Sequence, residues 1–117
     1  MYRVPPCPWI QTTAGNFSWG VVQHEYAHEV DFLLLDDGAR AKLLRVLGGT
    51  TWCHGDSQQL PHSDYGCERF ASTLAWAFWP SPENCMRRSA SQAETSAMPA
   101  SGFRALVRRL LGSVSRR

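Results

Sequence analysis

Apolar residues recur at helical spacing in four segments of the chain. They repeat at intervals of three and four residues, which is typical of a helix that buries one face. The predicted helices cover residues 18–35, 39–48, about 63–79 and 102–117. Asn16 or Ser18 can cap the first helix, and Gly48 and Gly49 stop the second. The pattern therefore predicts a mostly α-helical chain.

The stretches between these helices are irregular by composition. Residues 2–10 predict a short extended segment, which three prolines restrict to a sheet edge or a loop. Residues 49–62 predict a loop with Trp52 as its anchor. Residues 81–102 are rich in Ser, Ala and Pro and predict a loop or flexible linker. The sequence shows no other strong strand pattern, so the fold class is mostly α, or α+β at most.

Length and composition limit the architecture to one small domain. The chain has 117 residues, of which 44% are hydrophobic and 19% charged, as in globular rather than disordered proteins. Its net charge of +2 is too small to indicate a nucleic-acid partner. No stretch approaches the roughly 18 apolar residues of a membrane span. We expect a monomer with no nucleic-acid partner.

The C-terminal segment 102–117 combines an apolar face with a basic one. Five of the twelve basic residues lie within the last fourteen positions. Such a helix can lie on a membrane surface, but packing on the core is the commoner arrangement, because a chain this short needs every apolar face. The expected organisation is a core at 1–85, a loop or linker at 86–101, and a packed helix at 102–117.

The four cysteines, Cys7, Cys53, Cys67 and Cys85, leave two alternatives open. No C-x-x-C pair is present, which disfavours a cysteine zinc site, and an even number in a small domain fits two disulfides. The alternative is four free thiols in a cytosolic protein, because the N-terminal residues show no signal peptide. Localisation stays open, with an extracellular location favoured if the cysteines are paired.

The pairing expected first joins Cys53 to Cys85 and Cys7 to Cys67, although the other two connectivities stay open. A Cys53–Cys85 bond would close a loop of about thirty residues around the third helix. The chain-entropy model assigns such a loop roughly 3–4 kcal/mol. The bond would hold that helix in place even with a thin core.

The stretch QHEYAHEVDF at residues 23–32 contains the pattern H-E-x-x-H. His24 and His28 are four residues apart on a predicted helix, so their imidazoles share one face and can bind the same Zn²⁺. Glu25 lies beside the first histidine, where its carboxylate can reach a metal-activated water without binding the metal. Two histidines that share a helix face by coincidence are the alternative, so the surrounding sequence must decide.

A hydrolytic zinc site needs a third protein ligand and one open position for water. Asp31 shares the helix face, but it lies about 10 Å along the axis from His24. We expect it to orient a histidine nitrogen or to hold a nearby loop. Glu68 in YGCERFASTLAWAF is the better candidate, because a carboxylate at the edge of an apolar helix face needs a partner such as zinc. An exposed glutamate paired with Arg69 is the alternative.

The motif HEYAHEVDF followed by ERFASTLAWAF resembles the gluzincin-type zinc metallopeptidases, among them small bacterial zincins and the catalytic domain of the anthrax lethal factor family. The similarity covers roughly residues 17–80. It implies that His24, His28 and Glu68 bind zinc, and that the chain is a minimal zincin-like domain of about four helices. It also implies that Glu25 is the general base. Zincins usually carry several strands ahead of the motif helix, whereas here only residues 2–10 could provide one.

Zincins often place a tyrosine or histidine opposite the base, where it stabilises the oxyanion. Tyr65, His54 and His62 compete for that role here. Tyr65 is favoured because it lies one turn before Glu68 on the same predicted helix face.

The expected function is hydrolysis of a peptide or protein substrate by a zinc endopeptidase. Glu25 would take the proton of the metal-activated water and pass it to the leaving amine. Two alternatives stay open. One is a catalytically inactive zincin-like domain or a truncated fragment of a peptidase. The other is a helical domain without metal.

Overall fold

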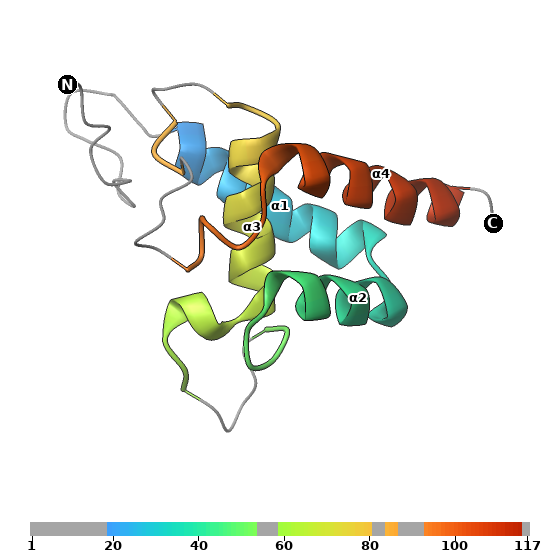
Figure 1. Ribbon diagram of the computed structural model, residues 1–117, viewed down its shortest axis with the longest axis horizontal. Coiled ribbons are helices and arrows are strands. Elements are labelled where there is room, and N and C mark those ends of the chain that lie inside the picture. The colour runs from blue at the N-terminus through green and yellow to red at the C-terminus, as the bar shows by residue number, and fades with distance from the viewer. Residues whose placement is uncertain (1–18, 54–58, 81–83, 87–92, 116–117) are drawn as a thin grey trace.

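The computed structural model describes residues 19–53, 59–80, 84–86 and 93–115, and it is mostly helical (Figure 1). The helices are α1 (Trp19–Leu34), α2 (Asp37–Leu47), α3 (Gly66–Ala77) and α4 (Ala100–Ser115), with a 3₁₀ turn η1 (His62–Asp64) ahead of α3. This confirms the mostly α fold class. Within the described ranges no strand forms, and a single parallel bridge joins Thr51 to Tyr65. The extended segment predicted at 2–10 lies outside these ranges.

Short polar and glycine signals set the boundaries of α2. The Asp36 side chain accepts a hydrogen bond from the Ala39 backbone N–H at 2.8 Å, so the helix begins two residues earlier than its apolar pattern predicts. Gly48 ends α2: its backbone N–H donates to the Leu44 carbonyl, and its φ is positive at 83°. Glycine adopts that conformation without steric cost, which explains the stop.

Helix α3 is the centre of the molecule. In Figure 1 it crosses α1, and both α2 and α4 pack against it. Phe70 of α3 is fully buried and lies in contact distance of Phe103 of α4 and Trp52 of the loop, with ring centroids 5.8 and 5.9 Å apart. Ala27 on α1 and Leu43 on α2 complete this cluster from two further helices. Helices α1 and α3 therefore cross beside this cluster (Figure 1).

The C-terminal helix packs on the core, as the apolar periodicity predicted. Phe103 and Val107 are buried at 0% and 4% exposure. The Arg104 guanidinium donates to the Ala77 carbonyl at 2.7 Å, which satisfies a carbonyl at the C-terminal end of α3. Of the predicted linker, Met86 and Thr95 are buried, so part of it belongs to the packed structure.

The loop after α2 runs beside the start of α3 and fixes it. Thr50 N–H donates to Asp64 O at 2.7 Å, and the Gly66 N–H donates to Thr51 O at 2.8 Å. A side chain at Gly66 would meet the Trp52 ring at 2.9 Å, so glycine alone lets this indole lie against the helix. The predicted anchoring role of Trp52 is confirmed by this contact and by its packing on Phe70.

The same backbone contacts determine which cysteines form a disulfide. Cys53 bonds to Cys67 with a Cα–Cα separation of 5.2 Å, so the pairing expected first was wrong in both of its bonds. The bridge between Thr51 and Tyr65 places the two following residues of each segment side by side, which brings Cys53 next to Cys67. Cys85 is also disulfide-bonded, and its partner lies outside the described residues. The alternative of four free thiols does not hold.

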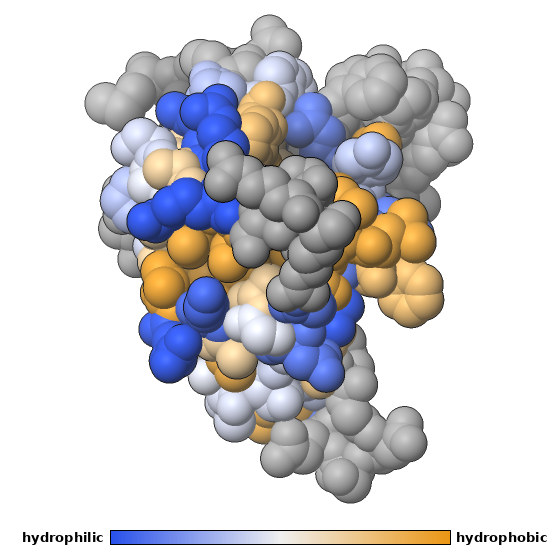
Figure 2. Space-filling view, turned by 90° about the vertical axis from the view of Figure 1, so that its right-hand side faces the viewer, coloured by the Kyte–Doolittle hydropathy of each residue, from blue (hydrophilic) through white to orange (hydrophobic). Residues whose placement is uncertain are grey.

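The surface carries apolar groups as well as charged ones (Figure 2). Phe32, Leu33 and Leu34 at the end of α1 are 77%, 69% and 45% exposed. Among the described residues, no helix has both the length and the apolar character needed to cross a membrane.

Candidate metal centre

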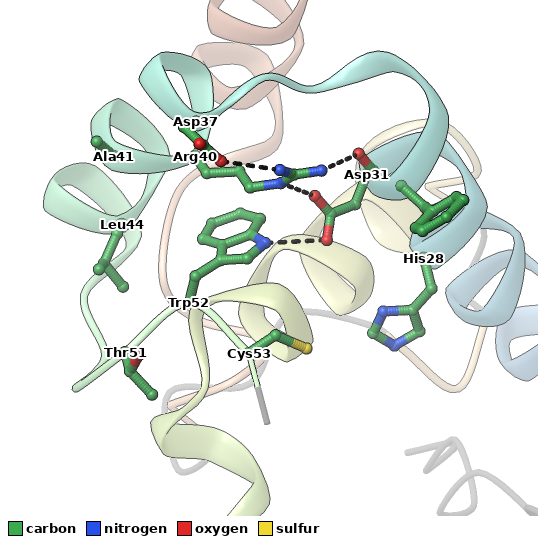
Figure 3. Close-up of a pocket in the computed structure, with 10 residues that line it drawn as sticks. His28, Asp31, Asp37, Arg40, Ala41, Leu44, Thr51, Trp52 and Cys53 are labelled. Carbon is green, nitrogen blue, oxygen red and sulfur yellow. Dashed lines mark hydrogen bonds and ion pairs between the residues drawn. The ribbon is translucent and has the colours of Figure 1, made fainter. Parts of the chain in front are cut away.

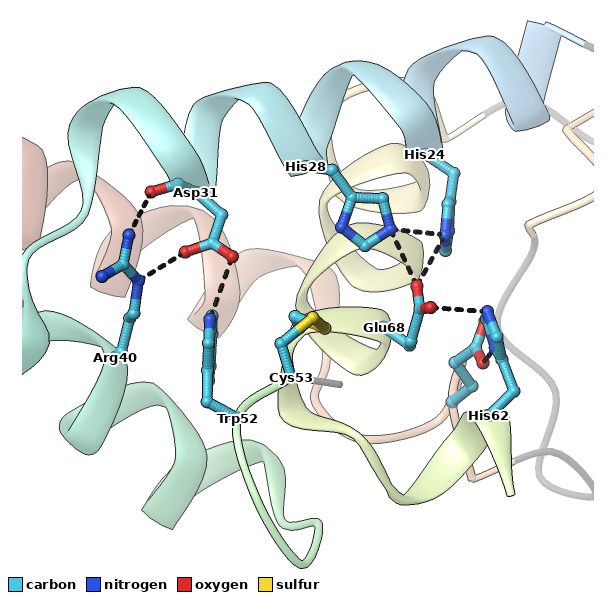
Figure 4. Close-up of a disulfide and its surroundings, with 10 residues drawn as sticks. His24, His28, Asp31, Arg40, Trp52, Cys53, His62 and Glu68 are labelled. Carbon is cyan, nitrogen blue, oxygen red and sulfur yellow. Dashed lines mark hydrogen bonds and ion pairs between the residues drawn. A yellow bond between two sulfur atoms is a disulfide. The ribbon is translucent and has the colours of Figure 1, made fainter. Parts of the chain in front are cut away.

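Helices α1 and α3 bring three candidate ligands to one point (Figure 4). His24 Nε2 lies 3.1 Å from His28 Nε2 and 3.1 Å from Glu68 Oε1. His28 Nε2 lies 2.8 Å from the same Glu68 oxygen. The two histidines come from successive turns of α1, and Glu68 faces them from the first turn of α3. The alternative of an exposed Glu68 does not hold, since its side chain is 7% exposed.

The three atoms His24 Nε2, His28 Nε2 and Glu68 Oε1 form a triangle whose geometry fits a zinc ion. Bonds of 2.0–2.2 Å in a tetrahedron hold ligand atoms about 3.3–3.6 Å apart, slightly more than the spacings found here. Two imidazole nitrogens and one carboxylate oxygen are also donors that Zn²⁺ prefers. The three residues would therefore be the ligands, and that role stays a prediction.

Glu25 lies at the open side of the centre. A carboxylate oxygen of Glu25 lies within 4.8 Å of a ring nitrogen of both His24 and His28, and its side chain is exposed. A carboxylate at this distance can contact a water held between the histidines and solvent. Glu25 therefore lies near both histidines, and its role as general base stays a prediction.

The surrounding carboxylates change the pKa of His28. Its hydrogen bond to Glu68 raises the pKa of His28 above the ordinary value of 6.5, against the opposing effect of burial. The nearby charges of Glu25 and Asp31 raise this pKa further. A proton on His28 would therefore compete with a metal ion for a ring nitrogen.

His62 enters the centre from the 3₁₀ turn that precedes α3. Its Nε2 lies 2.8 Å from Glu68 Oε2, the oxygen that does not face the α1 histidines. The other ring nitrogen bonds to Glu94. The sequence named His62 only as a minor candidate for oxyanion stabilisation, and it gave no signal for Glu94, which lies in the predicted linker.

Ser72 supports His24 from the next turn of α3. Its hydroxyl lies 3.0 Å from His24 Nδ1 and 2.5 Å from Glu94 Oε2. His24 is 1% exposed, so its Nδ1 needs such a partner within the protein. Ser72 lies four residues after Glu68, and this helical spacing was the one sequence signal that could have found it.

Asp31 holds a loop rather than a histidine. Its carboxylate accepts from Trp52 Nε1 at 2.9 Å and from Arg40 Nε at 2.8 Å, and its backbone carbonyl accepts from Arg40 Nη2 at 2.9 Å (Figure 4). One residue thus ties the end of α1 to α2 and to the loop that carries Cys53. Of the two roles expected for Asp31, the structure shows the second.

Tyr65 contacts the loop ahead of η1. The Tyr65 hydroxyl accepts from the Leu60 backbone N–H at 3.0 Å, and the side chain is 2% exposed. This bond supports the loop ahead of η1, and an oxyanion role for Tyr65 stays a prediction. His54 lies outside the described residues.

An open pocket of about 700 Å³ adjoins the centre at His28 (Figure 3). Phe32, Leu44 and Trp52 give it apolar walls, and the Asp31–Arg40 pair lines one side. The disulfide also borders it through Cys53. Because Trp52 is held by Asp31, Gly66 and Phe70, that wall of the pocket is fixed before any ligand enters.

Comparison of the chain with models of known protein families, with curated proteins and with solved structures finds no significant match.

Proposed function

We propose that the chain is a zinc-dependent peptidase domain that hydrolyses peptide bonds. The observation that carries this proposal is the convergence of His24 Nε2, His28 Nε2 and Glu68 Oε1 within 3.1 Å of one another. Three such donors match the protein ligands of a catalytic zinc site, which keeps one position for water. Zinc bound there would lower the pKa of a water molecule and polarise the peptide carbonyl.

The protein's own groups have separate roles in this proposal. Glu25 accepts the proton of the attacking water and returns it to the leaving amine, since it reaches the centre from the exposed side. Glu68 holds the two histidines against α3 and excludes solvent from the inner side of the centre. The pocket beside His28 takes one side chain of the substrate.

Purified protein tests the proposal in two measurements. Metal analysis should find one zinc per chain, and unstructured peptides should be cleaved by wild type but not after chelation. Glu25→Gln should keep the zinc and lose at least about 100-fold in kcat, because general-base catalysis contributes about 10²–10⁴-fold. Glu29→Gln is the matched control, since Glu29 is an exposed carboxylate one turn along α1. Full cleavage by Glu25→Gln would contradict the proposal.

A second candidate is metal binding without hydrolysis. It is favoured by one observation: within the described residues, the Thr51–Tyr65 bridge is the single strand-like pairing, so no sheet edge there can hold an extended substrate. Zinc in the purified protein with no cleavage of any peptide in a library would support this candidate. Zinc-dependent cleavage would exclude it.

A further inference from the structure

We propose that Glu94 is the positioning residue of the metal centre, acting on His24 through Ser72 and on Glu68 through His62. The inference rests on the proposed function, because it concerns how the same zinc site is held. Glu94 lies between α3 and α4, and its side chain is 15% exposed. Its two carboxylate oxygens go to two different side chains. One residue outside the H-E-x-x-H motif thus reaches two of the three expected ligands.

The first arm runs from Glu94 to His24. An ionised carboxylate can only accept hydrogen bonds, so the Ser72 hydroxyl gives its single proton to Glu94 Oε2, 2.5 Å away. The Ser72 oxygen then has to accept, and its donor is the Nδ1–H of His24 at 3.0 Å. A proton on Nδ1 leaves the lone pair of Nε2 for zinc. Glu94 therefore selects the tautomer of His24 that can bind metal.

The second arm runs from Glu94 to Glu68. Glu94 bonds to Nδ1 of His62, and this contact fixes which edge of the imidazole faces the centre. His62 Nε2 lies 2.8 Å from Glu68 Oε2, while Oε1 of the same carboxylate faces His24 and His28. His62 thus holds one oxygen of Glu68 and leaves the other for zinc. A ligand restrained in this way loses less freedom when the metal binds.

The amide variant Glu94→Gln separates this role from simple packing. Glutamine keeps the shape of the side chain but has one acceptor oxygen and one NH₂ donor, so it cannot accept from both Ser72 and His62. If the NH₂ faces Ser72, the hydroxyl is released to donate to His24 Nδ1, which moves the histidine proton to Nε2. Ser72→Ala cuts only the arm to His24, and His62→Ala cuts only the arm to Glu68.

Two readouts test the proposal without any peptidase assay. Competition against a chromophoric chelator measures zinc affinity, and nitrogen-15 NMR of chelated protein follows the Nδ1–H proton of His24. We expect Glu94→Gln to weaken zinc binding by about 10–100-fold, with smaller losses for Ser72→Ala and His62→Ala. The protected Nδ1–H signal should be present in wild type and absent in Ser72→Ala. Glu29→Gln, which removes an exposed carboxylate, should match wild type in both measurements.

Zinc affinity of Glu94→Gln within about 2-fold of wild type would overturn the proposal, since loss of an orienting residue costs about 10-fold or more. If wild type binds no zinc, the proposed function fails, and the NMR signal still decides the role of Glu94. Loss of the His24 Nδ1–H signal in Glu94→Gln supports positioning, whereas a signal that is unchanged in both Glu94→Gln and Ser72→Ala contradicts it. If Glu94→Gln does not fold, Ser72→Ala and His62→Ala test each arm separately, and wild-type behaviour in both variants overturns the proposal.

Discussion

Among the individual side chains, His28 is the expected ligand that solvent reaches most easily, with 28% of its side chain exposed. Its pKa is raised above 6.5, chiefly by the hydrogen bond to Glu68. In chelated protein the charged form therefore stabilises the fold. This contribution is fully present below the ordinary pKa of 6.5 and is lost as the pH rises through the raised value. Zinc bound at His28 would have the opposite pH dependence, because it would need the neutral form of this histidine.

The first prediction follows from these opposite pH dependences of folding without metal and of zinc binding. The rise in melting temperature caused by zinc should be small near about pH 5.5 and should grow steadily up to about pH 8. Thermal denaturation with zinc and with chelator across this range measures the difference. His28→Ala should remove both the zinc effect and most of its pH dependence. A zinc-induced rise that is equal at both ends of the range would contradict the account.

At the level of single residues, the sequence predicted part of the candidate site. The spacing of His24 and His28 and the position of Glu25 are local, so the motif predicted their common face. Glu68 could be named because a carboxylate beside an apolar face needs a partner. Glu94 could not, because its contact with the centre depends on the path of the chain between α3 and α4. No local pattern records that path.

Between elements, Asp31 joins α1 to α2 and to the loop after it through Arg40 and Trp52. The second prediction is that Asp31→Asn lowers the free energy of unfolding by about 2 kcal/mol. This is less than the roughly 3–5 kcal/mol of a fully buried pair, because the Arg40 side chain is 26% exposed. Asp37→Asn is the matched control, since Asp37 contacts the same guanidinium from a fully exposed position. Equal urea midpoints for Asp31→Asn and wild type would refute this role.

The third prediction concerns the disulfide that ties the loop to α3. Closing a loop of about 15 residues is worth about 3 kcal/mol in the chain-entropy model, so the Cys53→Ser/Cys67→Ser double variant should lose about that much. Both cysteines must be replaced, because the Cys67 sulfur lies within 4.8 Å of ligand atoms of His28 and Glu68 and would be free to bind metal. Denaturant unfolding measures the loss. A stability equal to wild type would show that the loop is ordered without the bond.

The elements themselves were largely predictable, and their cross-links were not. Apolar periodicity gave four helices in the right order, and Gly48 ended the second as expected. The start of α2 shifted because Asp36 caps it, which is a competing local signal. The pairing of Cys53 with Cys67 depends on the bridge between Thr51 and Tyr65. A single bridge produces no repeating pattern of apolar residues, so the sequence could not predict it.

For the molecule as a whole, all four helices share one core, and α4 is part of it. The fourth prediction is that Phe103→Ala lowers the free energy of unfolding by about 3–5 kcal/mol, because the phenyl ring is fully buried against Phe70. Zinc binding should weaken together with folding. Arg108→Ala, an exposed change on the same helix, should have no measurable effect. A native melting curve for Phe103→Ala would show that α4 is not needed for the fold.

The length of the chain predicted a single core, and helices α1 to α4 share one within the described residues, although Phe32, Leu33 and Leu34 stay exposed. The three expected zinc ligands lie where α1 crosses α3, which is also the centre of the fold. Metal binding and stability should therefore be coupled.

Zinc-edge anomalous diffraction from crystals grown with zinc tests the central claim most directly. The account predicts one strong peak about 2.0–2.2 Å from His24 Nε2, His28 Nε2 and a Glu68 oxygen. A peak coordinated by other residues, or no peak in protein that metal analysis shows to be saturated with zinc, would contradict it.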